Sequence, residues 1–299
     1  MIQVSNCTLL YPSKKGIQDV SFQIDKGKIF GYLGPNGAGK TTTIRALMGF
    51  MKPQQGSCMI NGMDCWSKRH VIQKDVGYLP GEIAFFDDMT GIEFLKFQLQ
   101  LKNIHDETMM KDLLDLFELD PKTMIRKMSK GMKQKIGIVC AFMSDPDVFI
   151  LDEPTSGLDP LMQQVVWELL LKKKHEGKTI LMSSHSFDEV EKTCDEVAMI
   201  KEGKIAVIED IDVLKKQRRK VFELTVKDHI DINKMKTLFE HVKVINDKTF
   251  EVEVIGDFHL FFQKVKEIDL IDLDVKTQRL EQVFMQYYGK DNNHEYNII

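Results

Sequence analysis

A glycine-rich segment near the start of the chain contains the residue types that bind phosphate. It fits the pattern G-x-x-x-x-G-K-[ST] and reads Gly34, Pro35, Asn36, Gly37, Ala38, Gly39, Lys40 and Thr41. Glycines let backbone N–H groups approach phosphate oxygens, and the helix expected at 42–48 adds positive potential at its N-terminus. Lys40 would place its ammonium on the β- and γ-phosphates, and the Thr41 hydroxyl would ligate Mg²⁺. We therefore expect this segment, together with Thr42, to bind a nucleotide.

Two carboxylates follow an apolar strand that is expected at 148–151. Ligands bind at the carboxyl ends of strands in α/β sheets, which is where Asp152 and Glu153 stand. Asp152 would hold Mg²⁺ directly or through water, and Glu153 would orient or deprotonate the water that attacks the γ-phosphate. A solvated Asp-Glu pair at a strand end is the alternative. Combined with Lys40, the pair predicts hydrolysis of a nucleoside triphosphate.

Further motifs narrow the class of nucleotide hydrolase. The segment Ser129-Lys-Gly131-Met-Lys-Gln134 stands before a helix expected at 133–143. Asp152-Glu-Pro, then Ser156-Gly-Leu-Asp159 and finally His185 follow it. In order and spacing these motifs resemble those of the ATP-binding cassette (ABC) ATPases, over about residues 1–215. The resemblance implies a P-loop NTPase core that uses ATP and Mg²⁺.

The resemblance also implies a site shared between two chains. Ser129 and the Gly131 backbone N–H would bind the γ-phosphate of ATP held by the opposite protomer, although Ser129 is also suited to a plain helix N-cap. Asp159 would lie across the dimer interface. Within one chain, His185 would contact the γ-phosphate near Glu153. Tyr11 matches the aromatic residue that stacks on adenine, and an ordinary exposed tyrosine is the alternative there.

Two positions depart from the family pattern. The family places a glutamine after a strand such as 76–80, but this chain has Gly81 and then Glu82. Glu82 is a possible ligand of Mg²⁺ or of its water in place of that glutamine. The signature carries Lys130 where a glycine is usual, and we expect it to change nucleotide affinity without abolishing function.

The elements that must position these residues indicate an α/β fold. The chain has 299 residues, which suggests two domains. The first alternates β-branched runs with helical patterns, as in a largely parallel sheet, and about 87–144 interrupts it with a helical subdomain that includes helices at 92–101 and 108–117. The strands expected in this core are 20–24, 28–33, 148–151, 179–182 and 196–201.

The pattern changes after about residue 215. A basic run at 215–220 reads as a solvated linker, or as a contact for anionic lipid headgroups. The order that follows is β-α-β-β-α-β, which predicts a small ferredoxin-like α+β domain at 216–290 and a tail at 291–299. Its expected strands are 221–226, 242–245, 250–255 and 270–275, and its expected helices are 232–239, 258–266 and 279–288.

Composition limits where the protein acts. The net charge of −4 argues against a broad basic surface for nucleic acid. The densest apolar run, 136–143, is less than half of the roughly 18 residues that a membrane span needs. The N-terminus has no signal-peptide pattern, and the 5 cysteines lack metal-ligand spacing. We therefore expect a cytoplasmic protein with free thiols.

The resemblance implies a peripheral ATPase on the inner face of the cell membrane. It would work with a separate transmembrane permease and with a second ABC ATPase chain, identical or not. Gly77-Tyr-Leu-Pro80, the signature and the tail segment Leu280-Glu-Gln-Val-Phe284 are most similar to bacterial ABC-2-type exporters, which include drug, bacteriocin or bacitracin and sodium efflux cassettes. The alternative is a soluble ABC ATPase that acts on ribosomes or DNA. Those proteins usually carry two cassettes or a long coiled coil, which this chain lacks.

Overall fold

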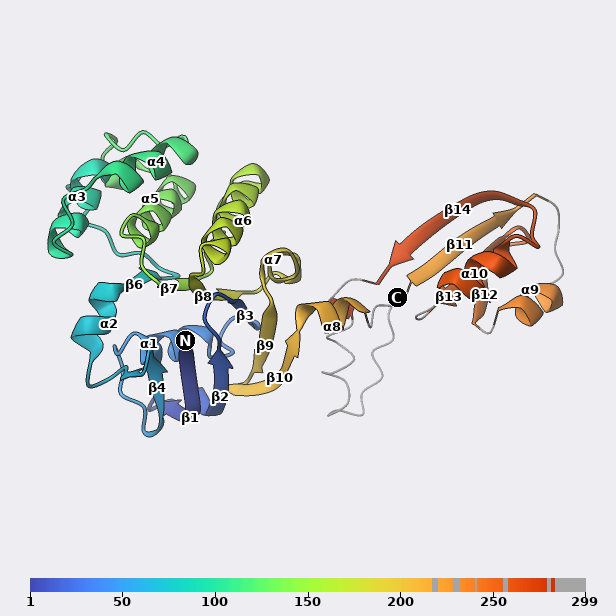
Figure 1. The fold of residues 1–299 in the computed structure, drawn as a ribbon, viewed down its shortest axis with the longest axis horizontal. Coiled ribbons are helices and arrows are strands. Elements are labelled where there is room, and N and C mark those ends of the chain that lie inside the picture. The colour runs from blue at the N-terminus through green and yellow to red at the C-terminus, as the bar shows by residue number, and fades with distance from the viewer. Residues whose placement is uncertain (217–219, 228–231, 240, 255–257, 279–280, 283–299) are drawn as a thin grey trace. The chain divides into compact units, whose positions relative to one another are not determined.

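The central sheet of the first unit places three loops that carry predicted site residues side by side, at the carboxyl ends of neighbouring strands. A computed structural model describes residues 1–216, 220–227, 232–239, 241–254, 258–278 and 281–282, and the chain divides into two compact units, Met1–Asp210 and Ile211–Ile299 (Figure 1). The sheet of the first unit has the strand order β10-β9-β3-β8-β7-β6. The bounds are β3 (Ile29–Leu33), β6 (Val76–Leu79), β7 (Val148–Asp152), β8 (Thr179–Ser184), β9 (Glu196–Lys201) and β10 (Lys204–Asp210).

The strands of this sheet are buried in the way that is typical of parallel sheets. All residues of β3, β7 and β8 are buried, as expected of parallel strands covered on both faces. Only β10 runs antiparallel to its neighbour. The register pairs Leu33 of β3 with Ser184 of β8, and Asp152 of β7 with Ser183 of β8. The loops that follow these three strands therefore open side by side.

A second, antiparallel sheet encloses the core from the other side. Its order is β2 (Gly16–Ile24), β1 (Ile2–Leu10), β4 (Gln55–Ile60) and β5 (Met63–Asp64). One apolar cluster joins both sheets and the helix α1 (Lys40–Leu47). Phe22 of β2 stacks on Phe30 of β3 with ring centroids 5.2 Å apart. The helix that follows the glycine-rich loop is thus held between two sheets.

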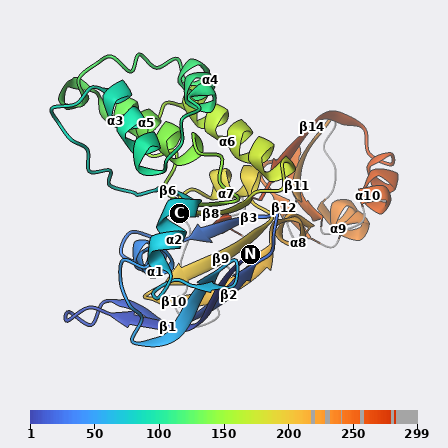
Figure 2. The same ribbon diagram turned by 60° about the vertical axis from the view of Figure 1, so that its left-hand side comes forward.

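The expected helical subdomain is confirmed. It contains α3 (Gly91–Leu101), α4 (Thr108–Leu116), a 3₁₀ turn (Ile125–Lys127) and α5 (Lys130–Phe142), which lie together apart from the sheets (Figure 2). Thr90 and Glu93 form a capping box at the start of α3. The short helix α2 (Arg69–Asp75) precedes β6, and α6 (Pro160–His175) and α7 (Phe187–Thr193) follow β7 and β8. Helices therefore connect all the parallel strands after β6.

The second unit has the expected ferredoxin-like topology. The helix α8 (Ile211–Lys216) is followed by β11 (Lys220–Val226), α9 (Ile232–Leu238), β12 (Val242–Val244), β13 (Thr249–Val254), α10 (Phe258–Val265) and β14 (Leu270–Thr277). The sheet order β12-β13-β11-β14 is antiparallel throughout. Phe222, Phe250 and Phe261 lie in its core. The predicted helix 279–288, apart from 281–282, and the tail 291–299 lie outside the described residues, as does 217–219 of the basic run.

In the part of the chain that the structure describes, no helix combines the length and the apolar character needed to cross a membrane.

Candidate active site

The glycine-rich loop takes a backbone form that only small residues allow. It connects β3 to α1, and Gly37 and Gly39 have φ values of +80° and +116°. A Cβ atom at Gly34 would lie 2.5 Å from the Ile200 carbonyl oxygen. The loop therefore packs closely against β9. The helix α1 begins at Lys40, two residues earlier than expected.

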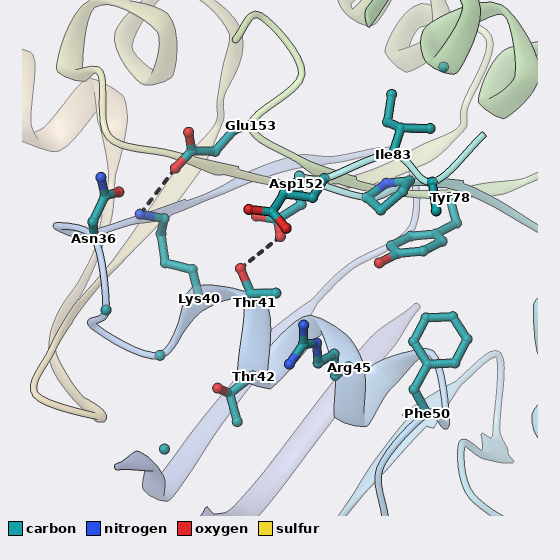
Figure 3. A pocket seen from close by; sticks show the side chains of 18 of the residues that line it. Asn36, Lys40, Thr41, Thr42, Arg45, Phe50, Tyr78, Ile83, Asp152 and Glu153 are labelled. Carbon is teal, nitrogen blue, oxygen red and sulfur yellow. Dashed lines mark hydrogen bonds and ion pairs between the residues drawn. The ribbon is translucent and has the colours of Figure 1, made fainter. Parts of the chain in front are cut away.

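Lys40 carries its charge into a nearly closed environment of oxygen atoms. The residue is 5% exposed, and its Nζ donates to the carbonyl oxygens of Gly34 at 2.6 Å and Pro35 at 3.4 Å. The same Nζ lies 3.4 Å from Glu153 Oε1 (Figure 3). A buried ammonium needs such partners. The loop thus holds the Lys40 ammonium among oxygen atoms of its own chain, opposite the Glu153 carboxylate.

Thr41 and Asp152 form the pair expected at a magnesium site. The Thr41 hydroxyl donates to Asp152 Oδ2 at 2.8 Å (Figure 3), and the Ser183 hydroxyl donates to Asp152 Oδ1. Within the described residues, no group of three or more His, Cys, Asp or Glu side chains could hold a metal. Mg²⁺ commonly binds through one or two protein oxygens together with substrate phosphates. The hard oxygen atoms of Thr41 and Asp152 therefore fit Mg²⁺.

The Glu153 carboxylate contacts both Lys40 and His185. Glu153 Oε2 is 3.2 Å from His185 Nδ1, and Oε1 faces Lys40. Glu153 has a φ of +52°, a left-handed conformation that is uncommon for a residue with a side chain. Its backbone N–H donates to Ser183, to the carbonyl oxygen at 3.2 Å and to the hydroxyl at 3.1 Å. β8 therefore holds the turn that directs this carboxylate toward Lys40.

No individual role was predicted from the sequence for two residues that contact the site. Ser183 binds both Asp152 and Glu153, and the only signal for it is a hydroxyl at the end of a buried strand. Gln134, 5% exposed on α5, donates from Nε2 to the carbonyl oxygens of Glu153 at 3.2 Å and Pro154 at 2.9 Å. Its signal is an amide on the helix face that also buries Ile138. Both residues fix the turn after β7.

The backbone of Gly81 lies against the Asp152 carboxylate. A Cβ atom at Gly81 would be 3.1 Å from Asp152 Oδ2 and 3.2 Å from Cγ. Such a distance is tighter than ordinary van der Waals contact, so any larger residue would press on the carboxylate. Glu82 is exposed and lines a cavity that Gly81 and Asp152 also line. Its role as a metal ligand stays a prediction.

A cavity of about 930 Å³ joins these groups to the predicted adenine site. The Tyr11 hydroxyl accepts from Arg45 Nη1 at 3.1 Å and donates to Met51 Sδ at 3.4 Å. Tyr78 also lines the cavity, and burial raises its pKa to about 12. The lining includes Tyr11, Asn36, Lys40, Thr41, Thr42, Arg45, Phe50, Tyr78, Gly81, Ile83, Asp152 and Glu153, of which Figure 3 shows most.

The residues predicted to act across a dimer do not line this cavity. The Ser129 hydroxyl accepts from the Met132 N–H at 3.2 Å and so caps α5, and Asp159 caps α6 by accepting from the Met162 N–H at 3.0 Å. The alkyl chain of Lys130 packs on Gly157, where a Cβ atom would be 3.1 Å from Cγ, Cδ and Cε. The signature and the segment 156–159 are thus in contact within one chain.

Comparison with known proteins identifies the family. The model of the "ABC transporter" family matches residues 17–156. The bacitracin transport ATP-binding protein BcrA of Bacillus licheniformis is 32% identical, over 97% of this chain and 97% of the relative. The chain belongs to the ABC transporter ATP-binding proteins. The ABC transporter ATP-binding protein NatA of Bacillus subtilis is 36% identical, over 69% of this chain and 87% of the relative.

Solved structures agree with this identification. The structure of an ATP-binding subunit of an ABC transporter superposes with a TM-score of 0.67 at 30% identity, and covers 72% of this chain and 92% of that one. A dimeric ATP-binding cassette bound to ADP and Pi superposes with a TM-score of 0.65 at 20% identity, over 71% of this chain and 99% of that one, and shows the shared fold. The predicted ABC ATPase fold is confirmed, and the chain is an ATP hydrolase.

Replacing Lys40 with alanine should weaken ATP binding about 10- to 100-fold, because a hydrogen bond to a charged group contributes roughly 1.5–3 kcal/mol. Binding of a fluorescent ATP analogue to the isolated chain measures this. Lys173→Ala is the matched control, since Lys173 is also buried and ion-paired, to Asp145 and Glu176, but does not line the cavity. Equal ATP affinity in Lys40→Ala and Lys173→Ala would contradict the assignment.

Restoring the family's glutamine with Gly81→Gln should impair this ABC ATPase, because the new Cβ displaces the Asp152 carboxylate from Thr41. We expect a several-fold higher Mg²⁺ concentration for half-maximal ATP binding, and the same direction for Gly81→Ala. Titration of Mg²⁺ at fixed ATP gives the value. Glu82→Gln tests the alternative ligand in the same assay. A Gly81→Gln protein with a normal Mg²⁺ requirement would show that Gly81 does not control the carboxylate.

Proposed function

We propose that this ABC ATPase powers a separate membrane permease of the exporter type, and works as an ATP-driven head-to-tail dimer on the inner face of the membrane. The similarity to BcrA supports the exporter assignment because it extends over both units and not over the cassette alone. The transported compound would then be a peptide antibiotic or a related molecule. The named relatives are transport proteins, so the ribosomal or DNA alternative gains no support.

The contacts described above support a division of roles within one chain. Lys40 would exchange its carbonyl partners for oxygens of the β- and γ-phosphates, and Tyr11 would stack on adenine. Thr41 and Asp152 would hold Mg²⁺, which neutralises developing charge on the phosphates when bound. Glu153 would accept a proton from the attacking water at a carboxylate oxygen. His185, 3.2 Å from Glu153, would orient that carboxylate and contact the γ-phosphate.

A second chain would complete each site. Ser129 and the Gly131 N–H stand at the N-terminus of α5, a 13-residue helix, and do not line their own chain's cavity. Helix N-termini bind anions well. In a head-to-tail pair they would contact the γ-phosphate on the opposite protomer, and Asp159 would lie across the interface. Supplying such contacts in trans resembles an arginine finger, which contributes on the order of 10³–10⁵ in rate.

An aromatic cluster supports a permease contact beside the helical subdomain. The Phe85 and Phe94 rings are 5.0 Å apart, and Phe86 packs edge-on against Phe97 at 5.9 Å. Phe86 is nevertheless 53% exposed. The helical insertion is where transporter cassettes of this family dock on cytoplasmic helices of a permease. An exposed phenylalanine in such a place fits an apolar partner helix.

Glu153→Gln should retain ATP binding but lose most hydrolysis, because an amide cannot accept the proton of the attacking water. A general base contributes about 10²–10⁴ in rate. With ATP bound and not consumed, this variant should also accumulate as a dimer, which light scattering measures. Adding Ser129→Ala should reduce the dimer without weakening ATP binding by the monomer. Near-normal turnover in Glu153→Gln would remove Glu153 from its catalytic role.

The permease assignment is tested by isolating membranes from cells that express the tagged chain, and identifying the polytopic protein that co-purifies in equal amount after mild detergent extraction. Phe86→Glu should release the chain into the soluble fraction, while the ATPase rate of the isolated protein stays normal. Ile208→Glu, on the exposed strand β10, is the control that should stay bound. Recovery of the unaltered chain only with ribosomes or DNA would overturn the transporter assignment.

A further inference from the structure

A buried carboxyl group lies beside the catalytic edge of the sheet and takes no part in the chemistry described above. Glu189 of α7 is 2% exposed. Its Oε2 accepts a hydrogen bond from the Ser184 hydroxyl, with the oxygen atoms 2.6 Å apart. Ser184 is the last residue of β8 and stands directly before His185. Burying a carboxyl group is costly unless hydrogen bonds satisfy it, so its position requires a physical reason.

The hydrogen bonds of Glu189 enclose the backbone on both sides of His185. The Ser184 hydroxyl that donates to Glu189 also accepts from the Ser186 N–H at 2.9 Å. The Ser186 hydroxyl in turn accepts from the Glu189 N–H at 3.4 Å and caps α7. His185 is therefore bracketed by two serines that are both tied to one glutamate. Its imidazole is 62% exposed, so packing alone does not fix where it points.

The surroundings of the carboxyl group connect it to the turn after β7. Burial raises the pKa of Glu189. The side chains of Ser184, Thr155 and Trp167 act in the opposite direction and lower it. Thr155 belongs to the turn that follows Glu153 and Pro154. Thr155 and Trp167 lie near the carboxyl group without completing its hydrogen bonds, since within the described residues Glu189 Oε1 and Trp167 Nε1 have no hydrogen-bond partner. An amide has the same shape and keeps one oxygen that can accept from the Ser184 hydroxyl, so glutamine should fit the same space.

We propose that Glu189 is a positioning residue for ATP hydrolysis, which holds Ser184 and so fixes the end of β8 in the orientation that brings His185 to Glu153. The inference rests on the proposed roles of Glu153 and His185. It predicts a loss confined to the chemical step, because Lys40, Thr41 and Tyr11 bind the nucleotide from other elements. A role limited to anchoring α7 would instead lower stability and leave turnover unchanged.

The test compares steady-state ATPase kinetics of the full chain in four variants. Glu189→Leu removes the acceptor at similar volume, and Ser184→Ala removes the donor. Each should lower kcat about 10- to 100-fold, as small misplacements of catalytic groups do, and change KM by less than about threefold. The kcat of the double variant should be no lower than that of the less active single variant, because both substitutions remove the same hydrogen bond. Glu189→Gln should retain most activity, since its amide oxygen can accept from Ser184.

Val190→Ala is the matched control. Val190 is fully buried on the same helix and packs beside Gly31 of β3, so its truncation destabilises α7 without touching Ser184. We expect a lower melting temperature and a normal kcat. If Glu189→Leu fails to fold, Ser184→Ala provides the same comparison with a smaller change.

Three outcomes would overturn the inference. The first is a kcat in Glu189→Leu or Ser184→Ala that is no lower than in Val190→Ala. The second is a rise in KM as large, as a fold-change, as the fall in kcat. The third is a Glu189→Gln protein as inactive as Glu189→Leu. Failure of the proposed function is recognised separately, because unaltered protein would then hydrolyse no ATP, or Glu153→Gln would hydrolyse it normally.

Discussion

The buried carboxylate of Asp152 is the group on which the arrangement of the site depends. It is 2% exposed at the end of an apolar strand, and a charge in that place must be satisfied by hydrogen bonds. Thr41 from α1 and Ser183 from β8 supply them. One carboxylate thereby ties together the loops after three neighbouring strands. The glycines of the phosphate-binding loop, the left-handed Glu153 and the exposed His185 all take their places relative to this junction.

Much of the site was predictable because its residues follow one another closely along the chain. The phosphate-binding loop and the Asp152–Glu153 pair each depend on local sequence, and parallel pairing then brings them together. The roles of Ser183 and Gln134 were not predictable in this way, since each depends on which residue lies opposite it across a strand pair or a helix contact. The expected helices at 42–48 and 133–143 also began too late, because the motif residues themselves form the first turns of α1 and α5.

The antiparallel sheet shows the same limit for the fold. Only one of its strands was expected from the sequence, at 20–24. β1 pairs on one side with the nearby β2 and on the other with β4, about fifty residues along the chain, so its pairing with β4 depends on contacts that local pattern does not contain. All four strands of the second unit were expected, and in β11 buried residues alternate with half-buried ones. Alternation of this kind identifies a strand that has one buried face.

The helix α5 connects two parts of the site, and this connection determines how the sites of two chains could influence each other. Its first turn presents Ser129 and Gly131, and Gln134 holds the carbonyl oxygen of Glu153 in the same chain. A helix is stiff over one turn. If the first turn of α5 contacts a nucleotide that the partner chain holds, that contact would also constrain the Glu153 carbonyl oxygen that Gln134 binds. In a closed pair this linkage runs in both directions. ATP consumption would then rise more steeply than the occupancy of either site.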